Sequence, residues 1–227
     1  MKYKAVIFDL FGTLIKNFPW DESNSVLRRM AGELSLSPDD FTALWHAAFD
    51  ERMKGVLKNY QACIRHICQR LGAQVPDDRI ERVADMRFEM NKREVAAPRE
   101  GAVEVLSYLK AHGFKTGLIS NCSTETTLVW GNSPLAPLID VAVFSCLVGA
   151  MKPAPCIYQL AVEKLAVEPE ECLYVADGME QELLSASRLG MRAILIRVPG
   201  EDDYDPYREK WGGQVISSLK QVLTLVK

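Results

Sequence analysis

The chain has 227 residues, of which 48% are hydrophobic and 25% are charged, and its formal net charge is −3. These values are typical of a globular protein with room for one domain, or for one domain with a smaller one inserted. The small negative charge gives no reason to expect a nucleic acid or an anionic membrane as a partner. The apolar runs are far shorter than the roughly 18 residues that span a bilayer, and the first residues are not typical of a signal peptide, so we expect a cytoplasmic protein.

The run from Lys4 to Leu14 predicts a buried strand followed by a tight turn, because β-branched and aromatic residues lead into an acid and a glycine. Asp9 then ends the strand, at the edge where open α/β sheets bind ligands, and is a candidate nucleophile or metal ligand. Gly12 permits the sharp turn, and the Thr13 hydroxyl can fix it. Because a short motif of this kind also ends ordinary strands, the rest of the chain must supply partners for Asp9.

Residues from about 16 to 97 have a helical period and almost no strand signal, which predicts an inserted helical bundle. A first helix is expected through Val26, Met30 and Leu34. A second begins after Ser37 as N-cap and continues to Met53. A third ends before residue 72, where glycine follows the apolar period, and a fourth runs from about residue 77 to 96.

Beyond residue 98 strand and helix patterns alternate, which is the signature of βαβ units and a parallel sheet. A helix is expected near 101–112, a strand at 115–121 and another near 141–148. Pro153 is expected to start the next helix, which continues through Val167. A strand at 172–176, a helix at 181–189 and a last core strand at 193–198 follow, before a loop rich in proline, glycine and acids at 199–206.

The six cysteines form no closely spaced pair, which favours reduced thiols in the core over a zinc site or a disulfide framework. Cys122 lies near the expected site, just after a predicted strand end. No histidine is near it in the sequence to activate a thiolate, so we interpret it as a bystander.

Four predicted strands are followed by side chains that carry chemistry: Asp9, Ser120, Lys152 and Asp177. In a parallel sheet these ends share one edge, so the four side chains are expected to converge. Two carboxylates, a main-chain carbonyl and waters suit Mg²⁺. Lys152 would neutralise negative charge, while Ser120 and the amides around Asn121 would bind an anionic oxygen. Singly, each residue has a simpler role as a loop cap, a surface charge or a turn residue.

The order of these residues resembles the four motifs of the haloacid dehalogenase superfamily of hydrolases. The matching segments are FDLFGTL at 8–14, LISN at 118–121, MKP at 151–153 and VADGMEQE at 175–182, with Ala176 in place of a frequent glycine. The resemblance covers the whole chain. It implies an α/β fold with a doubly wound, mainly parallel Rossmann-like core formed by residues 1–15 and 98–227, and an all-helical cap domain formed by residues 16–97.

The resemblance also implies roles for individual residues. Asp9 attacks the substrate and is transiently esterified, after which water cleaves the ester. Asp9, the main-chain carbonyl of Phe11 and Asp177 hold Mg²⁺. Glu182 supports the fourth motif without binding the metal. The group that binds the transferring part of the substrate consists of Gly12, Thr13, Ser120, Asn121 and Lys152. The cap closes over the site and selects the substrate. Phe18 and Trp20 are expected in the hinge packing, with direct contact to the substrate as the alternative.

One position departs from the pattern. Phosphatases of the family usually carry a second aspartate where this chain has Phe11, and phenylalanine cannot exchange a proton with the leaving group. Dehalogenases of the family also lack that acid, but they need no metal and generally lack the acid that Asp177 preserves here. We therefore favour a magnesium-dependent hydrolase of a small phosphorylated metabolite, with a metal-independent 2-haloacid dehalogenase as the alternative.

Two further alternatives stay open. A phosphonate-cleaving relative would need a cap lysine for a Schiff base, and Lys54 and Lys58 are available. A degenerate member of the family, which has lost catalysis, would only bind a ligand or a partner. The sequence leaves the choice between a monomer and a homodimer open, and it does not name the substrate.

Overall fold

The computed structural model describes residues 3–17, 20–201 and 210–226. Within them one six-stranded sheet has the strand order β3-β2-β1-β4-β5-β6, and all neighbouring strands are parallel. The strands are β1 (Ala5–Phe8), β2 (Lys115–Ser120), β3 (Val141–Phe144), β4 (Cys172–Ala176), β5 (Arg192–Ile196) and β6 (Val215–Ile216). Because the chain crosses from one side of β1 to the other between β3 and β4, the carboxyl edge of β1 and β4 is a switch point where such sheets bind ligands.

β1 lies inside the sheet and is wholly buried, which explains its unbroken run of apolar residues. Phe8 is aligned with Leu118 of β2 and with Val175 of β4, so the residues after these strands emerge close together. The register therefore brings the ends of three strands, far apart in the sequence, to one place.

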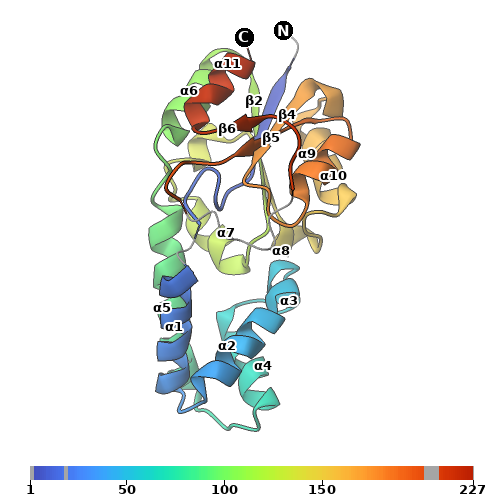
Figure 1. Cartoon of the computed structure of the whole chain (residues 1–227). Coiled ribbons are helices and arrows are strands. Elements are labelled where there is room, and N and C mark those ends of the chain that lie inside the picture. Colours follow the sequence, from blue (N-terminus) through green and yellow to red (C-terminus); the bar gives the residue numbers. More distant parts are fainter. Residues whose placement is uncertain (1–2, 18–19, 202–209, 227) are drawn as a thin grey trace.

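Helices cover both faces of the sheet, which confirms the predicted doubly wound α/β fold. One face carries α6 (Ala102–Ala111), α7 (Thr124–Trp130) and α11 (Val222–Leu225), and Figure 1 shows α6 and α11 together on that side. The other face carries α9 (Pro155–Leu165) and α10 (Glu182–Arg188). Each layer buries its own hydrophobic cluster against the sheet. Short 3₁₀ helices at Ala136–Leu138, Pro169–Glu171 and Leu219–Gln221 complete the connections.

A helical unit extends from the carboxyl edge of the sheet (Figure 1). It contains α1 (Trp20–Glu33), α2 (Pro38–Ala47), α3 (Phe49–Met53), α4 (Tyr60–Arg70) and α5 (Asp77–Val95). These helices enclose a hydrophobic cluster of their own. Two of these helices have an N-cap side chain. The Ser37 hydroxyl accepts a hydrogen bond from the Asp40 amide at 3.4 Å at the start of α2, and the Asn59 side chain accepts one from the Ala62 amide at 2.8 Å at the start of α4. The unit meets the sheet domain where α5 packs on α7 and where α3 packs on α8 (Ser145–Val148).

Several predicted boundaries are wrong. The second helix does not continue to Met53, because Ala48 leaves helical geometry with ψ 12° and α3 starts anew. The strand predicted at 141–148 stops at Phe144, since Ser145 turns into the short helix α8. The helix predicted to start at Pro153 starts at Pro155 and ends at Leu165, while Pro153 follows a cis peptide bond after Lys152.

The structure contains elements that the sequence pattern did not predict. The strand at Arg192–Ile196 is not the last, because β6 pairs with its outer edge, and α7 and α11 were also missed. Of the loop predicted at 199–206, residues 202–206 lie outside the described part of the chain. No helix among the described residues is long and apolar enough to cross a bilayer.

Candidate active site

The turn after β1 holds Asp9 with only 5% of its surface exposed. The carbonyl of Leu10 accepts the amides of Thr13 and Leu14 at 3.3 and 3.0 Å, which closes the turn. Arg99, 6% exposed, donates from Nε to the Thr13 carbonyl and from Nη2 to the Gly12 carbonyl, both at 2.8 Å. Arg99 therefore fixes the backbone of the turn, and sequence reasoning missed it because no motif marks this residue.

Gly12 lies directly beside Asp177, the residue that follows β4. Its φ is +82°, and a Cβ atom there would lie 2.1 Å from Asp177 Oδ2. The Asn17 side chain donates to the same Oδ2 atom at 2.9 Å, and the Met179 amide donates to Oδ1 at 3.3 Å. Asn17 was not predicted, but its contact links the segment after the first motif to the acid of the fourth.

Lys152 connects two acids at the centre of the site. Its Nζ, in a residue 4% exposed, donates to Asp9 Oδ1 and lies 2.6 Å from Glu182 Oε2. Glu182 Oε2 also accepts the Tyr174 hydroxyl at 2.7 Å, and its Oε1 accepts the Gly178 amide at 3.2 Å. Both Glu182 oxygens are thus engaged by the protein.

Burial raises the pKa of Asp9 to about 6, although the ammonium group of Lys152 opposes the rise. Burial favours the neutral form of Lys152, but attraction by Asp9 and Glu182 outweighs it and raises the pKa of Lys152 above its ordinary value. At neutral pH both Asp9 and Lys152 are therefore charged. This is the ionisation state in which Asp9 can act as a nucleophile.

Asn121 ties the end of β2 to Lys152. Its Oδ1 accepts the Lys152 amide at 2.8 Å, and its Nδ2 donates to the Lys152 carbonyl at 3.0 Å and to Glu180 Oε2 at 2.5 Å. The side chain of Asn121 therefore positions Lys152. Ser120, wholly buried, precedes it at the strand end.

Three buried oxygens of the site lack a nitrogen or oxygen partner among the described residues: Asp9 Oδ2, Thr13 Oγ1 and Ser120 Oγ. A buried polar atom without a partner costs free energy unless a ligand supplies one. Thr13 and Ser120 can donate to an anionic oxygen, whereas the carboxylate oxygen of Asp9 can only accept or bind a cation.

The donor set fits a hard divalent cation. Asp9, Asp177 and Glu182 each offer an oxygen, and these oxygens all lie within 4.8 Å of one another. Glu182 pairs with the Lys152 ammonium, and Asp177 accepts the Asn17 side chain and the Met179 amide. Asp9 Oδ2, by contrast, has no nitrogen or oxygen partner among the described residues, so it is the oxygen most open to a cation. Carboxylate oxygens are the ligands that Mg²⁺ prefers.

The helical unit reaches the site edge through Tyr60. Its amide donates to Glu125 Oε1 at 2.5 Å, and its hydroxyl pairs with Ser123 at 3.3 Å, three residues after Ser120. Of the aromatic residues predicted in the hinge, Trp20 is 63% exposed and stacks on His46, and Phe18 lies outside the described residues.

The two lysines considered for a Schiff base lie at the surface of the helical unit. Lys54 pairs with Asp50 at 2.7 Å, and Lys58 is exposed. Among the cysteines, Cys146 is half-buried and Cys156 is exposed, so the prediction of six core thiols is wrong for these two.

A doubly wound parallel sheet with acids and a lysine gathered at its carboxyl edge defines an α/β enzyme. The model of the haloacid dehalogenase-like hydrolase family matches residues 3–190, so the chain belongs to this family and is a hydrolase.

Relatives of the chain include proteins that are named for different activities. It is 32% identical over 152 residues to the rhythmically expressed gene 2 protein of Drosophila melanogaster, a match that covers 63% of this chain and 57% of that protein. It is 27% identical over 208 residues to a glyceraldehyde 3-phosphate phosphatase of Methanopyrus kandleri, covering 89% and 88% of the two chains. Identity to (S)-2-haloacid dehalogenase 1 of a Pseudomonas species is 24% over 235 residues, covering 97% and 96%.

The fold is also that of a solved structure. The HAD phosphatase of Thermococcus onnurineus superposes with a TM-score of 0.68 at 21% identity, covering 98% of this chain and 97% of that one.

Proposed function

We propose that the protein is a magnesium-dependent phosphohydrolase that acts on a small phosphorylated metabolite through a covalent aspartyl intermediate. The observation that carries the proposal is the position of Asp177, whose carboxylate lies within 4.8 Å of those of Asp9 and Glu182. A metal-independent dehalogenase has no need of this second buried acid. The similarity to a glyceraldehyde 3-phosphate phosphatase supports the same choice.

In the proposed reaction, Asp9 Oδ2 attacks phosphorus, and the bond from phosphorus to the leaving oxygen breaks with its electron pair on that oxygen. The leaving alkoxide takes a proton from water, because Phe11 offers none. A second water then attacks the phosphorus of the aspartyl phosphate, which restores the Asp9 carboxylate and releases phosphate.

Other residues prepare the site for this reaction. Lys152 holds Asp9 Oδ1 and leaves Oδ2 for attack, while Thr13 and Ser120 offer hydroxyls to the phosphoryl oxygens. Asp9, Asp177 and the Phe11 carbonyl would hold Mg²⁺, which neutralises charge on the transferring group. We propose that residues 16–97 form the cap, anchored through Tyr60 and closing over residues 1–15 and 98–227.

The test is a phosphatase screen of the purified protein with and without Mg²⁺, using phosphate esters with leaving groups of graded acidity. We expect Mg²⁺-dependent phosphate release that is fastest for acidic leaving groups, and its loss in Asp9→Asn. Metal-independent release of halide from a 2-haloacid, with no phosphate release from any ester, would overturn the proposal.

The second candidate is a 2-haloacid dehalogenase, which Phe11 favours because a departing halide needs no proton. The similarity to (S)-2-haloacid dehalogenase 1 agrees with it. One variant distinguishes the two candidate functions. In a dehalogenase, Asp177→Asn would leave halide release largely intact. In a metal-dependent phosphatase, the same change would abolish phosphate release. Specific ligand binding without any turnover would instead indicate the degenerate member.

A further inference from the structure

Two cysteines follow the ends of neighbouring strands beside the site. Ser120 of β2 is in register with Phe144 of β3, so Cys122 and Cys146 each follow their strand at the same distance. The Ser145 hydroxyl accepts the Cys122 amide at 3.0 Å and donates to the Cys122 carbonyl at 3.4 Å, which fixes the two segments to each other. Because Cys146 directly follows Ser145, these bonds hold the backbones of the two cysteines near each other.

The two thiols differ in accessibility. Cys122 is 2% exposed, whereas Cys146 is half-buried. The neighbouring Cys122 side chain lowers the pKa of Cys146 although burial opposes the change, whereas burial raises the pKa of Cys122 well above its ordinary value. Cys146 is therefore the more nucleophilic and more accessible thiol, with Cys122 behind it.

We propose that Cys122 and Cys146 form an oxidation site, at which a peroxide converts the thiol pair into a disulfide. The Cys146 thiolate attacks one peroxide oxygen, the O–O bond breaks, and the departing oxygen takes a proton, leaving a sulfenic acid on Cys146. The Cys122 sulfur then displaces hydroxide from that sulfur, and the thiol proton leaves with it as water. The two thiols are oxidised by two electrons, and the peroxide is reduced to an alcohol or to water.

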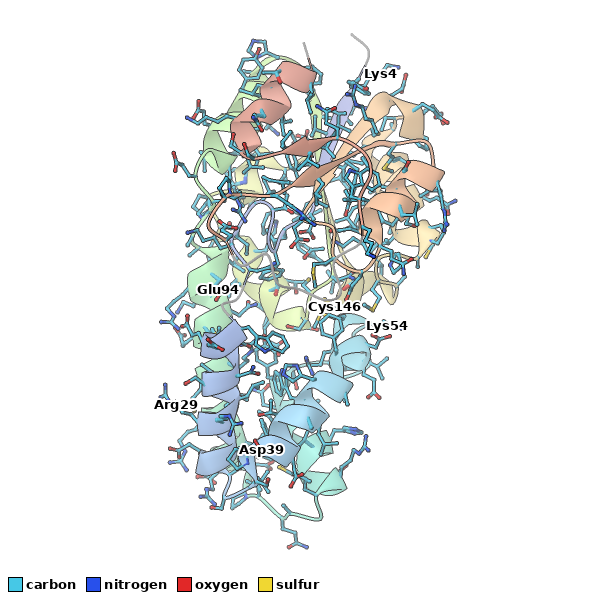
Figure 2. The ribbon with its side chains drawn as sticks, viewed as in Figure 1. Lys4, Arg29, Asp39, Lys54, Glu94 and Cys146 are labelled. Carbon is cyan, nitrogen blue, oxygen red and sulfur yellow. The ribbon has the colours of Figure 1, made fainter. Side chains whose placement is uncertain are left out.

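A disulfide between Cys122 and Cys146 would affect segments that adjoin both the site and the helical unit. Cys122 follows Asn121, whose side chain holds the Lys152 backbone. A disulfide at Cys122 would therefore restrain the segment that positions Lys152. On the other side, a Cβ atom on Gly55 would lie 2.2 Å from the Cys146 carbonyl. Figure 2 shows Cys146 near Lys54, at the junction with the helical unit.

The first experiment measures the bond itself and does not rest on the proposed function. The fully reduced protein is treated with hydrogen peroxide, alkylated, digested without reductant and examined by mass spectrometry. We expect a peptide that joins Cys122 to Cys146, present in Cys156→Ser and absent in Cys146→Ser. Because Cys156 is exposed, it is the matched control for accessibility. A Cys146 sulfinic acid with Cys122 still alkylatable, or faster oxidation of Cys156, would overturn the proposal.

The second experiment follows turnover of an aryl phosphate and therefore rests on the proposed function. We expect oxidation to lower kcat at least tenfold, with recovery after dithiothreitol, while Cys146→Ser keeps the kcat of the reduced protein and resists peroxide. A crosslinked protein with unchanged kcat would overturn the link to the site. A protein with no phosphatase activity before oxidation would overturn the proposed function and leave the crosslink measurement to decide the oxidation site.

Discussion

At the scale of single residues, Gly12 leaves no space for a side chain beside Asp177. We predict that Gly12→Ala abolishes phosphatase activity, because its Cβ atom would lie 2.1 Å from Asp177 Oδ2, and that it destabilises the fold by about 1–3 kcal/mol through backbone strain. The matched control is Gly113→Ala, with φ +79° and nothing within 4 Å of the added atom. Urea denaturation should show a loss of stability in both variants, and only Gly12→Ala should lose activity. Equal activity of the two variants would contradict this role of Gly12.

Phe11 gives the sharpest residue-scale test of the mechanism. We predict that Phe11→Asp raises the rate for alkyl phosphates by about 10²-fold, since general acid catalysis typically contributes 10²–10⁴-fold. Aryl phosphates should gain little, because their leaving groups are already acidic. Phe11→Asn removes the same ring and offers no acid, so it is the control. Steady-state kinetics on both ester classes decide, and equal gains in the two variants would refute the prediction.

Residues that carry chemistry at strand ends could be predicted from the sequence, because an acid or lysine after an apolar strand is visible there. Asp9 and Lys152 do converge in the structure. Asn17 and Arg99 could not be predicted, since each acts on a partner that only the fold brings near. Their side chains have no local pattern that separates them from surface polar residues.

At the scale of elements, the last turn of α5 contains an acidic residue, Glu94, whose surroundings disfavour its charged form. Burial raises the pKa of Glu94 to about 7, and Glu22 adds to this rise, while Arg87 and Arg93 oppose it. Glu94 also lies in the last turn of α5, where the helix dipole disfavours negative charge. Figure 2 shows Glu94 where the helical unit meets the sheet domain.

We predict that the protein loses stability as pH rises from about 4.5 to about 7. The folded state holds the Glu94 proton more tightly than the unfolded state, so this contribution is complete below the unfolded pKa and is lost once pH passes the folded one. Glu94→Gln should flatten the decline, and Glu89→Gln, which removes an exposed acid on the same helix, should not. Urea denaturation at several pH values measures the effect, and parallel curves for the two variants would exclude Glu94 as the cause.

Long periodic elements could be predicted from the sequence, and short ones could not. The fourth helix of the bundle was predicted from about residue 77 to 96, and α5 spans Asp77–Val95. The break at Ala48 and the turn at Ser145 depend on tertiary contacts, such as the bond from the Cys122 amide to Ser145. β6 is two residues long, too short for any period to be visible.

At the scale of the whole molecule, metal binding should appear as stability. We predict that Mg²⁺ raises the free energy of unfolding by about 2.7 kcal/mol at about 100 times its dissociation constant, because the cation binds the folded state alone. Asp177→Asn should remove this gain, since it takes away one of the two engaged carboxylates. Asp39→Asn is the control, because Asp39 is a surface residue of the helical unit paired with Arg28. Thermal denaturation with Mg²⁺ and with EDTA measures the gain, and an unchanged Mg²⁺ effect in Asp177→Asn would place the cation elsewhere.

The overall arrangement could be predicted because alternating elements admit few parallel topologies, whereas the docking of the helical unit could not. That docking depends on pairs such as Asn91 with Thr126 at 3.0 Å and Ser133 with the Val95 carbonyl at 2.9 Å. These residues are polar and unremarkable in the sequence, and they acquire a role only when two separate hydrophobic clusters are already formed.

The position of β1 inside the sheet also bears on how the chain folds during synthesis. β1 is translated long before its two neighbours, since it pairs with residues 115–118 on one side and 172–175 on the other. The helices of residues 20–95 have their hydrophobic partners among themselves. They can therefore pack together before the strands that pair with β1 have been synthesised. A ribosome-bound chain that stops before residue 172 would therefore present a folded helical unit, while the strand that leads to Asp9 keeps one edge open.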